Sequence, residues 1–152
     1  MKSKTNQRHT HFDDELRLDR IQIVTGGPGS GKTSLVQSRK GPADIVVDLD
    51  YLAAAVSLGT VHGDHKGVYS TAWRLFDFLV DQIDAGSLTY DRAWIITTSQ
   101  AEQIQKKTGG TIIKLDPGLQ EALRRIEADD SCTEEEKRRR KDSCLGYYYK
   151  KG

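Results

Sequence analysis

The fold of this chain follows from one stretch near its N-terminus, Ile21-Gln22-Ile23-Val24-Thr25-Gly26-Gly27-Pro28-Gly29-Ser30-Gly31-Lys32-Thr33-Ser34-Leu35-Val36. A short apolar run leads into the pattern G-x-x-x-x-G-K-T, and a helical pattern begins near Lys32. The glycines let the backbone turn so that successive N–H groups point into one concavity, which the positive N-terminal end of the helix completes. An ordinary glycine-rich turn is the alternative, but every motif position is filled and both flanks fit. We therefore predict a phosphate-binding P-loop between a strand and a helix.

The P-loop predicts a site for a nucleoside triphosphate and Mg²⁺. Lys32 would reach the β- and γ-phosphates, and the hydroxyl of Thr33 would ligate the metal ion. We expect the nucleotide to be held by the whole loop, which comprises Gly26, Gly27, Pro28, Gly29, Ser30, Gly31, Lys32, Thr33 and Ser34.

Length and composition favour one intracellular domain. The 152 residues carry a formal net charge of +1, which provides no general attraction to nucleic acids or membranes. There is no signal core at the N-terminus and no apolar run of membrane-spanning length. Neither Cys132 nor Cys144 has a metal-ligand companion at short spacing, so we expect reduced thiols in the cytoplasm. We expect a flexible polar tail over residues 1–12 and a single domain over residues 13–152.

Strand and helix patterns alternate along the chain. Short β-branched runs at residues 44–48, 93–97 and 111–115 predict buried parallel strands like the run before the P-loop. The clearest amphipathic helix covers residues 70–84. This alternation predicts an α/β fold, a three-layer α/β/α sandwich around a mostly parallel sheet of four or five strands.

Three local signals predict where later helices begin. Capping boxes are formed by Ser99 with Glu102 and by Thr133 with Glu136. The dipeptide at residues 116–117, Asp-Pro, would supply an N-cap and a first-turn proline.

Two carboxylates follow the strand at residues 44–48. The ligand cleft of such a sheet lies at the carboxyl ends of its strands, and Asp48 and Asp50, two residues apart in extended chain, face the same side. One would hold a Mg²⁺-bound water while the other accepts a proton from an acceptor hydroxyl. Alternatively, Asp50 is simply the N-cap of a helix at residues 51–58, a role that is compatible with catalysis. The strand at 94–99 ends without Asp or Glu, unlike the Walker-B strand of ring-forming and transport ATPases, so the arrangement suits small kinases better.

The P-loop, the Asp48-x-Asp50 strand end, and residues 115–118 (Leu-Asp-Pro-Gly) running into an Arg-bearing helix together resemble the small P-loop kinases. More narrowly, they resemble the zeta-toxin-like kinase superfamily, the compact ATP-binding kinase-like proteins of bacteriophages and the kinase domain of phage polynucleotide kinase, over about residues 19–149. The Asp-x-Asp pair is also similar to that of shikimate and gluconate kinases, where such acids contact Mg²⁺ and the acceptor hydroxyl. The chain departs from the polynucleotide kinase pattern where residues 51–53 (Tyr-Leu-Ala) stand in place of an Arg after the acidic pair.

The resemblance implies roles for individual residues. Asp48 or Asp50 would be the base, with Asp50 preferred for contact with the acceptor, and Asp48 would also serve the metal ion. Arg125 would approach the nucleotide, which the resemblance implies to be ATP. A helical lid at about residues 129–141 would bring Arg138, with Arg139 and Arg140 as close alternatives, to the transferring phosphoryl group. Alternatively, these three arginines form a solvated, ion-paired helix face with the glutamates at 134–136.

The loop at residues 59–69 would cover the acceptor in kinases of this layout. Acceptor binding is expected for His62 and His65 of this loop and for Arg74 of the following helix. Alternatively, the loop is simply exposed and Arg74 is balanced by neighbouring acids. A zinc site formed by His62 and His65 would lack further ligands of convincing spacing.

We expect an ATP- and Mg²⁺-dependent kinase that transfers the γ-phosphoryl group to a hydroxyl of a nucleoside, a nucleotide or a nucleic-acid 5′ end. The expected location is the cytoplasm, which is the host cytoplasm if the chain is phage-encoded. A small-metabolite kinase of the shikimate or gluconate type is one alternative. A nucleotide-binding accessory ATPase with a protein partner is another.

Overall fold

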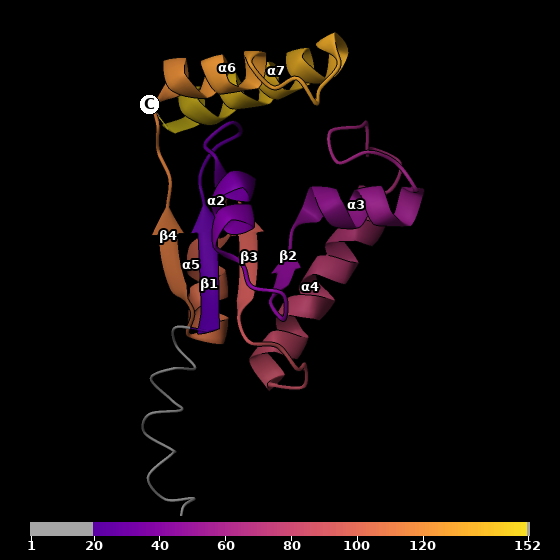
Figure 1. The fold of residues 1–152 in the computed structure, drawn as a ribbon, viewed down its shortest axis with the longest axis vertical. Coiled ribbons are helices and arrows are strands. Elements are labelled where there is room, and N and C mark those ends of the chain that lie inside the picture. The colour runs from indigo at the N-terminus through magenta and orange to yellow at the C-terminus, as the bar shows by residue number, and fades with distance from the viewer. Residues whose placement is uncertain (1–19, 152) are drawn as a thin grey trace, which may run out of the picture.

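The computed structural model describes residues 20–151 (Figure 1). The tail expected at residues 1–12 lies outside the described residues, as does the beginning of the expected domain. The described elements are β1 (Ile21–Thr25), α2 (Lys32–Arg39), β2 (Ile45–Val47), α3 (Leu49–Ser57), α4 (Tyr69–Ala85), β3 (Ala93–Thr97), α5 (Ala101–Thr108), β4 (Thr111–Lys114), α6 (Leu119–Glu127) and α7 (Glu134–Lys151).

The four strands form one parallel sheet in the order β2-β3-β1-β4. Residue Ile23 of β1 pairs with Ile95 of β3 on one side and with Ile112 of β4 on the other. The chain passes from β1 toward β2 on one side and later crosses β1 to reach β4, so the strand order reverses beside β1. Such a reversal is where open α/β sheets hold their ligands, outside the carboxyl ends of the strands. Figure 1 shows those ends pointing toward α6 and α7.

Helices cover both faces of the sheet because alternate strand residues point to opposite faces. Toward α4 and α5 the core includes Ile21, Ile23, Phe76, Val80, Ile95 and Ile104. On the opposite face, Val36 of α2 packs against Val24, Trp94 and Ile96. Burial of each large apolar side chain contributes about 1.5–3 kcal/mol. The predicted three-layer α/β/α sandwich with a parallel sheet is confirmed.

The pair α6–α7 forms a separate layer across the carboxyl edge of the sheet (Figure 1). The two helices pack on each other through Ala122 and Ile126 of α6 and Cys144 of α7, which are all fully buried. The lid expected at about residues 129–141 corresponds to the α6–α7 connector and the first part of α7. Among residues 20–151, no helix is both long enough and apolar enough to cross a membrane.

The predicted helix starts are partly correct. The capping box of Thr133 and Glu136 is confirmed by reciprocal bonds of 3.0 and 3.2 Å at the start of α7. The box expected at Ser99 is wrong, because Gln100 occupies the cap position of α5 and its N–H bonds to the hydroxyl of Thr97 instead. The cap expected at residues 116–117 is also wrong. Helix α6 begins after Gly118, whose backbone φ of 89° only glycine adopts at low cost.

Candidate active site

The P-loop joins β1 to α2 at the centre of the carboxyl edge. Gly29 and Gly31 have φ values of 76° and 91°, in the left-handed region that side chains with a Cβ disfavour. Gly31 is the N-cap of α2, and no side chain among the described residues bonds to the first-turn N–H groups. These donors and the helix dipole are therefore directed at the concavity of the loop, as phosphate binding requires.

The side chain of Lys32 folds back onto the P-loop. Its Nζ donates to the carbonyl oxygens of Gly26 and Gly27 at 2.6 and 3.0 Å. Burial lowers the pKa of Lys32 to about 8, against the opposing effect of the negative charges of Asp48 and Asp50. The two carboxylates are thus close enough to Lys32 to act on its charge, as the predicted kinase site requires.

The two acids differ in their local roles. Asp48 is the N-cap of α3, and its Oδ1 accepts the N–H of Tyr51 at 3.0 Å. Burial raises the pKa of the Asp48 carboxyl, and the charge of Asp50 adds to this increase. The alternative considered for Asp50, that it caps the helix, is wrong because the helix begins two residues earlier and Asp48 caps it. The side chain of Asp50 is half-exposed.

Two aromatic residues hold Asp50 from one side. The hydroxyl of Tyr69 donates to Asp50 Oδ1 at 3.4 Å, and His65 Nδ1 lies 3.5 Å from the same oxygen. Burial and the charge of Asp50 raise the pKa of Tyr69, which keeps the phenol protonated as a donor. His65 is buried, with Nε2 at 2.7 Å from the carbonyl of Thr60. His65 Nδ1 is buried and has no hydrogen-bond partner among the described residues, although it lies beside the Asp50 carboxylate.

Helices α6 and α7 contribute arginines that contact the P-loop and the loop between α3 and α4. Arg125 of α6 donates from Nη1 to the carbonyl of Ser30 in the P-loop at 3.0 Å, so it lies where the nucleotide was predicted to bind. Arg139 of α7 donates to the carbonyl of His62 at 3.3 Å. The positive charge of Arg140 contributes to the lowered pKa of Lys32, which places Arg140 within electrostatic reach of the P-loop.

The remaining predicted residues are less closely associated with the site. Arg138, the first choice for the lid arginine, is exposed on α7. Arg74 is exposed on α4, and within the described chain it makes no hydrogen bond or ion pair with another predicted site residue. Thr33 follows Lys32 in the first turn of α2 and is half-buried there.

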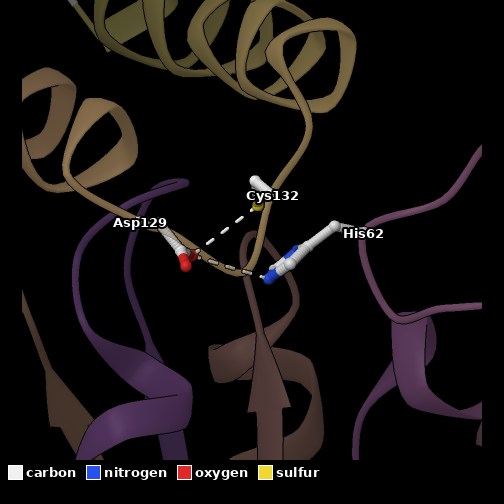
Figure 2. A group of neighbouring side chains, drawn as sticks. All are labelled: His62, Asp129 and Cys132. Atoms are coloured by element: carbon white, nitrogen blue, oxygen red, sulfur yellow. Dashed lines mark hydrogen bonds and ion pairs between the residues drawn. The ribbon is translucent and has the colours of Figure 1, made fainter.

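A compact cluster of His62, Asp129 and Cys132 lies beside Arg140 (Figure 2). His62 Nε2 and Cys132 Sγ lie 3.8 and 3.7 Å from the same oxygen, Asp129 Oδ2. Arg140 Nη1 donates to that oxygen at 2.8 Å and lies 3.1 Å from the sulfur. Burial and the charge of Arg140 lower the pKa of His62, while a hydrogen bond from Ser131 and the contact with Arg140 lower the pKa of Asp129. The cluster therefore combines a neutral imidazole with an ionised carboxylate.

Sequence reasoning missed four residues of this region: Tyr69, Asp129, Cys132 and Tyr147. Tyr147 packs so closely on the P-loop that a Cβ at Gly27 would lie 2.5 Å from its ring. The run of three tyrosines at 147–149 was the only signal for this contact, and it has no positional pattern that points to a P-loop. Asp129 and Cys132 lie three residues apart in the sequence, but their partner His62 is far away along the chain.

Comparison with known proteins identifies the fold. No protein-family model matches the chain, and no curated protein matches it. The crystal structure of TT1252 from Thermus thermophilus matches with a TM-score of 0.51 and 19% identity, covering 88% of this chain and 84% of that one. Shikimate kinase from Acinetobacter baumannii, solved in complex with shikimate, matches with a TM-score of 0.52 and 12% identity over 90% of this chain and 82% of the other. The chain has a P-loop kinase-like fold.

Proposed function

We propose that the protein is an ATP-dependent kinase that transfers the γ-phosphoryl group to a hydroxyl of a nucleoside, a nucleotide or a nucleic-acid 5′ end. The observation that carries the proposal is the position of Asp50 in the first turn of α3, directly after β2 and at the same carboxyl edge of the parallel sheet as the P-loop. The negative charges of Asp48 and Asp50 also oppose the lowering of the Lys32 pKa. A binding module would need the P-loop alone. A phosphoryl-transfer enzyme also needs a base beside the phosphate site.

The proposed reaction assigns one task to each group. The acceptor hydroxyl oxygen attacks the γ-phosphorus, the bond to the bridging oxygen of ADP breaks, and Asp50 accepts the hydroxyl proton. Tyr69 donates a hydrogen bond to the Asp50 carboxylate, and His65 lies beside it. Lys32 and the first-turn N–H groups of α2 stabilise the charge on the phosphate oxygens.

The residues present fit a magnesium ion. The Asp48 carboxylate and the Thr33 hydroxyl are the hard oxygen ligands that Mg²⁺ prefers, and the proximity of Asp48 to Lys32 places it beside the phosphate site. When bound, the ion would neutralise the charge of the β- and γ-phosphates. Asp48 keeps its position because it caps α3.

We assign the lid role to Arg140 in place of Arg138. Arg140 is the arginine of the 138–140 run whose charge acts on Lys32, and its side chain is held by Asp129. An arginine near the P-loop can stabilise the charge of the transferring phosphoryl group. Arg125, bonded to the P-loop carbonyl of Ser30, supports the nucleotide side of the site.

The preference for a nucleoside, nucleotide or nucleic-acid acceptor rests on the resemblance to bacteriophage kinases. A small-metabolite kinase is the second candidate, since one matching structure is a shikimate kinase solved with shikimate. The third candidate, an accessory ATPase, predicts phosphate release without a phosphorylated product.

A transfer assay with γ-labelled ATP and Mg²⁺ separates the candidates. The acceptors are a 5′-hydroxyl oligonucleotide, pooled nucleosides and nucleotides, and a metabolite pool, with Lys32→Ala as the control. We expect label on the oligonucleotide or a nucleoside, and no transfer by Lys32→Ala. Label on a metabolite would support the second candidate instead, and label released only as phosphate would contradict the kinase proposal.

A further inference from the structure

The cluster of His62, Asp129 and Cys132 joins two segments that are distant in sequence (Figure 2). His62 belongs to the loop between α3 and α4, whereas Asp129 and Cys132 belong to the connector between α6 and α7. One donor atom from each of the three side chains lies within 4.8 Å of the other two. The cluster therefore joins the loop between α3 and α4 to the connector between α6 and α7.

Hydrogen bonding accounts for only part of this cluster, in which Cys132 Sγ donates to Asp129 Oδ2 at 3.7 Å. The 3.8 Å between His62 Nε2 and Asp129 Oδ2 exceeds the usual length of an N–H···O bond, which is about 2.7–3.2 Å. Ligand bonds of about 2.0–2.3 Å in a tetrahedral zinc site place neighbouring ligand atoms about 3.3–3.6 Å apart. The observed 3.8 and 3.7 Å need only a small contraction to reach that geometry.

The donor set selects the type of ion. One imidazole nitrogen, one thiol sulfur and one carboxylate oxygen suit Zn²⁺, whereas Mg²⁺ and Ca²⁺ require oxygen ligands. We propose that His62, Asp129 and Cys132 bind a zinc ion, with a water molecule as the fourth ligand. Binding would release the thiol proton of Cys132, so that the thiolate and the carboxylate balance the two positive charges.

Arg140 would compete with this ion. Its guanidinium now contacts two of the three donor atoms of the cluster, Asp129 Oδ2 at 2.8 Å and Cys132 Sγ at 3.1 Å. Zinc would take over both contacts and release the arginine, whose charge already acts on Lys32. Zinc would also clamp the connector between α6 and α7 onto the loop after α3. The metal site is thus linked to the position of the helical pair over the P-loop.

Zinc titration of the full chain under reducing conditions, against a chromophoric chelator, tests the proposal. We expect one zinc ion per chain, with binding at least tenfold weaker in Cys132→Ser and in His62→Ala. Cys144→Ala is the matched control, because Cys144 is also a free, buried cysteine but lies away from the cluster, and it should bind zinc as the wild type does. A chain with His9→Ala and His11→Ala should also retain its zinc, which excludes the histidines of the N-terminal residues.

Cobalt substitution provides a readout that needs no variant. Co²⁺ bound to the wild-type chain should show a sulfur-to-cobalt charge-transfer band, which Cys132→Ser removes and Cys144→Ala keeps. Arg140→Gln should bind zinc more tightly than the wild type, because it removes the competing cation. Lys32→Ala should bind zinc normally, which makes the result independent of kinase activity. Zinc binding that is unaffected by both Cys132→Ser and His62→Ala, or a cobalt spectrum without the sulfur band, would overturn the proposal.

Discussion

The two walls of the candidate site are built in different ways. The P-loop wall, residues 26–34, is contiguous, and it offers mainly backbone N–H groups and one lysine. The assembled wall consists of Asp50, His62, His65 and Tyr69 on one side and Arg140 on the other, which come from α3, α4, the loop between them and α7. Local sequence determines the first wall. Contacts between distant segments determine the second, so its chemistry depends on how the helical pair α6–α7 sits on the sheet.

The largest effect is expected at Asp50, because it is the proposed base of the assembled wall. Asp50→Asn keeps the shape of the side chain but cannot accept the proton, so kcat should fall about a thousandfold. ATP affinity should change little, since the P-loop wall holds the nucleotide. Asp64→Asn, at an exposed acid of the loop between α3 and α4, is the matched control and should transfer normally. Wild-type turnover by Asp50→Asn would remove Asp50 from the mechanism.

The difference between the contiguous P-loop wall and the assembled wall explains which features could be predicted from the sequence. The P-loop, the four strands and the amphipathic helix α4 follow from short-range patterns, and the structure confirms them. The Asp48–Asp50 pair was predictable as a unit, but the assignment of the helix cap within the pair was wrong by two residues. The bond between Arg140 and Asp129 of the α6–α7 connector was not predictable from the sequence, and the choice of Arg138 as the lid arginine stays a prediction. The sequence pattern of α7 does not show which of its neighbouring arginines will contact a residue of another segment.

The second-largest effect should separate these two arginines. Arg140→Gln should lower kcat about a hundredfold, because it removes a positive group that would face the developing charge of the phosphoryl group. Arg138→Gln is the matched control on the same helix, and its exposed side chain should be dispensable. Steady-state kinetics of both variants at saturating ATP would measure the difference. Equal losses in both would favour a general charge effect of the helix instead of a specific role for Arg140.

A smaller effect, on the stability of the fold, should test the contact between α7 and the P-loop wall. Gly27 stands at a variable position of the P-loop motif, yet an added Cβ would lie 2.5 Å from the ring of Tyr147. Gly27→Ala should therefore destabilise the fold by about 1–3 kcal/mol through overpacking. In a Tyr147→Ala background the same substitution should cost almost nothing, because the clash is gone. Denaturant unfolding of the four proteins in this double-mutant cycle measures the coupling. Independent, additive effects would mean that Tyr147 does not rest on Gly27.

The smallest expected effect is the pH dependence of ATP binding, which follows from the charge of Lys32. Groups of both walls act on the ammonium nitrogen of this residue. Burial lowers the pKa of Lys32 to about 8, so half of the unbound protein carries a neutral lysine at that pH. The folded chain binds this proton less tightly than the unfolded chain does. Lys32 therefore opposes folding below pH 8, and this opposition disappears as the pH rises from 8 toward 10.5.

ATP should reverse this shift, because its phosphates place negative charge beside Lys32 and raise the lysine's pKa in the complex. Binding at pH 8 should then take up about half a proton at this residue, and affinity should fall about tenfold between pH 8 and pH 9.5 as the unbound lysine loses its proton. Calorimetry in buffers of different ionisation enthalpy measures the uptake directly. Lys32→Met, which cannot titrate, is the control and should lose the uptake along with much of the affinity. An ATP affinity that is constant from pH 7 to pH 9.5 would mean that Lys32 stays charged in the unbound protein. Asp48 and Asp50, whose charges favour the protonated lysine, would then outweigh its burial, and the assembled wall would determine the chemistry of the P-loop wall as well.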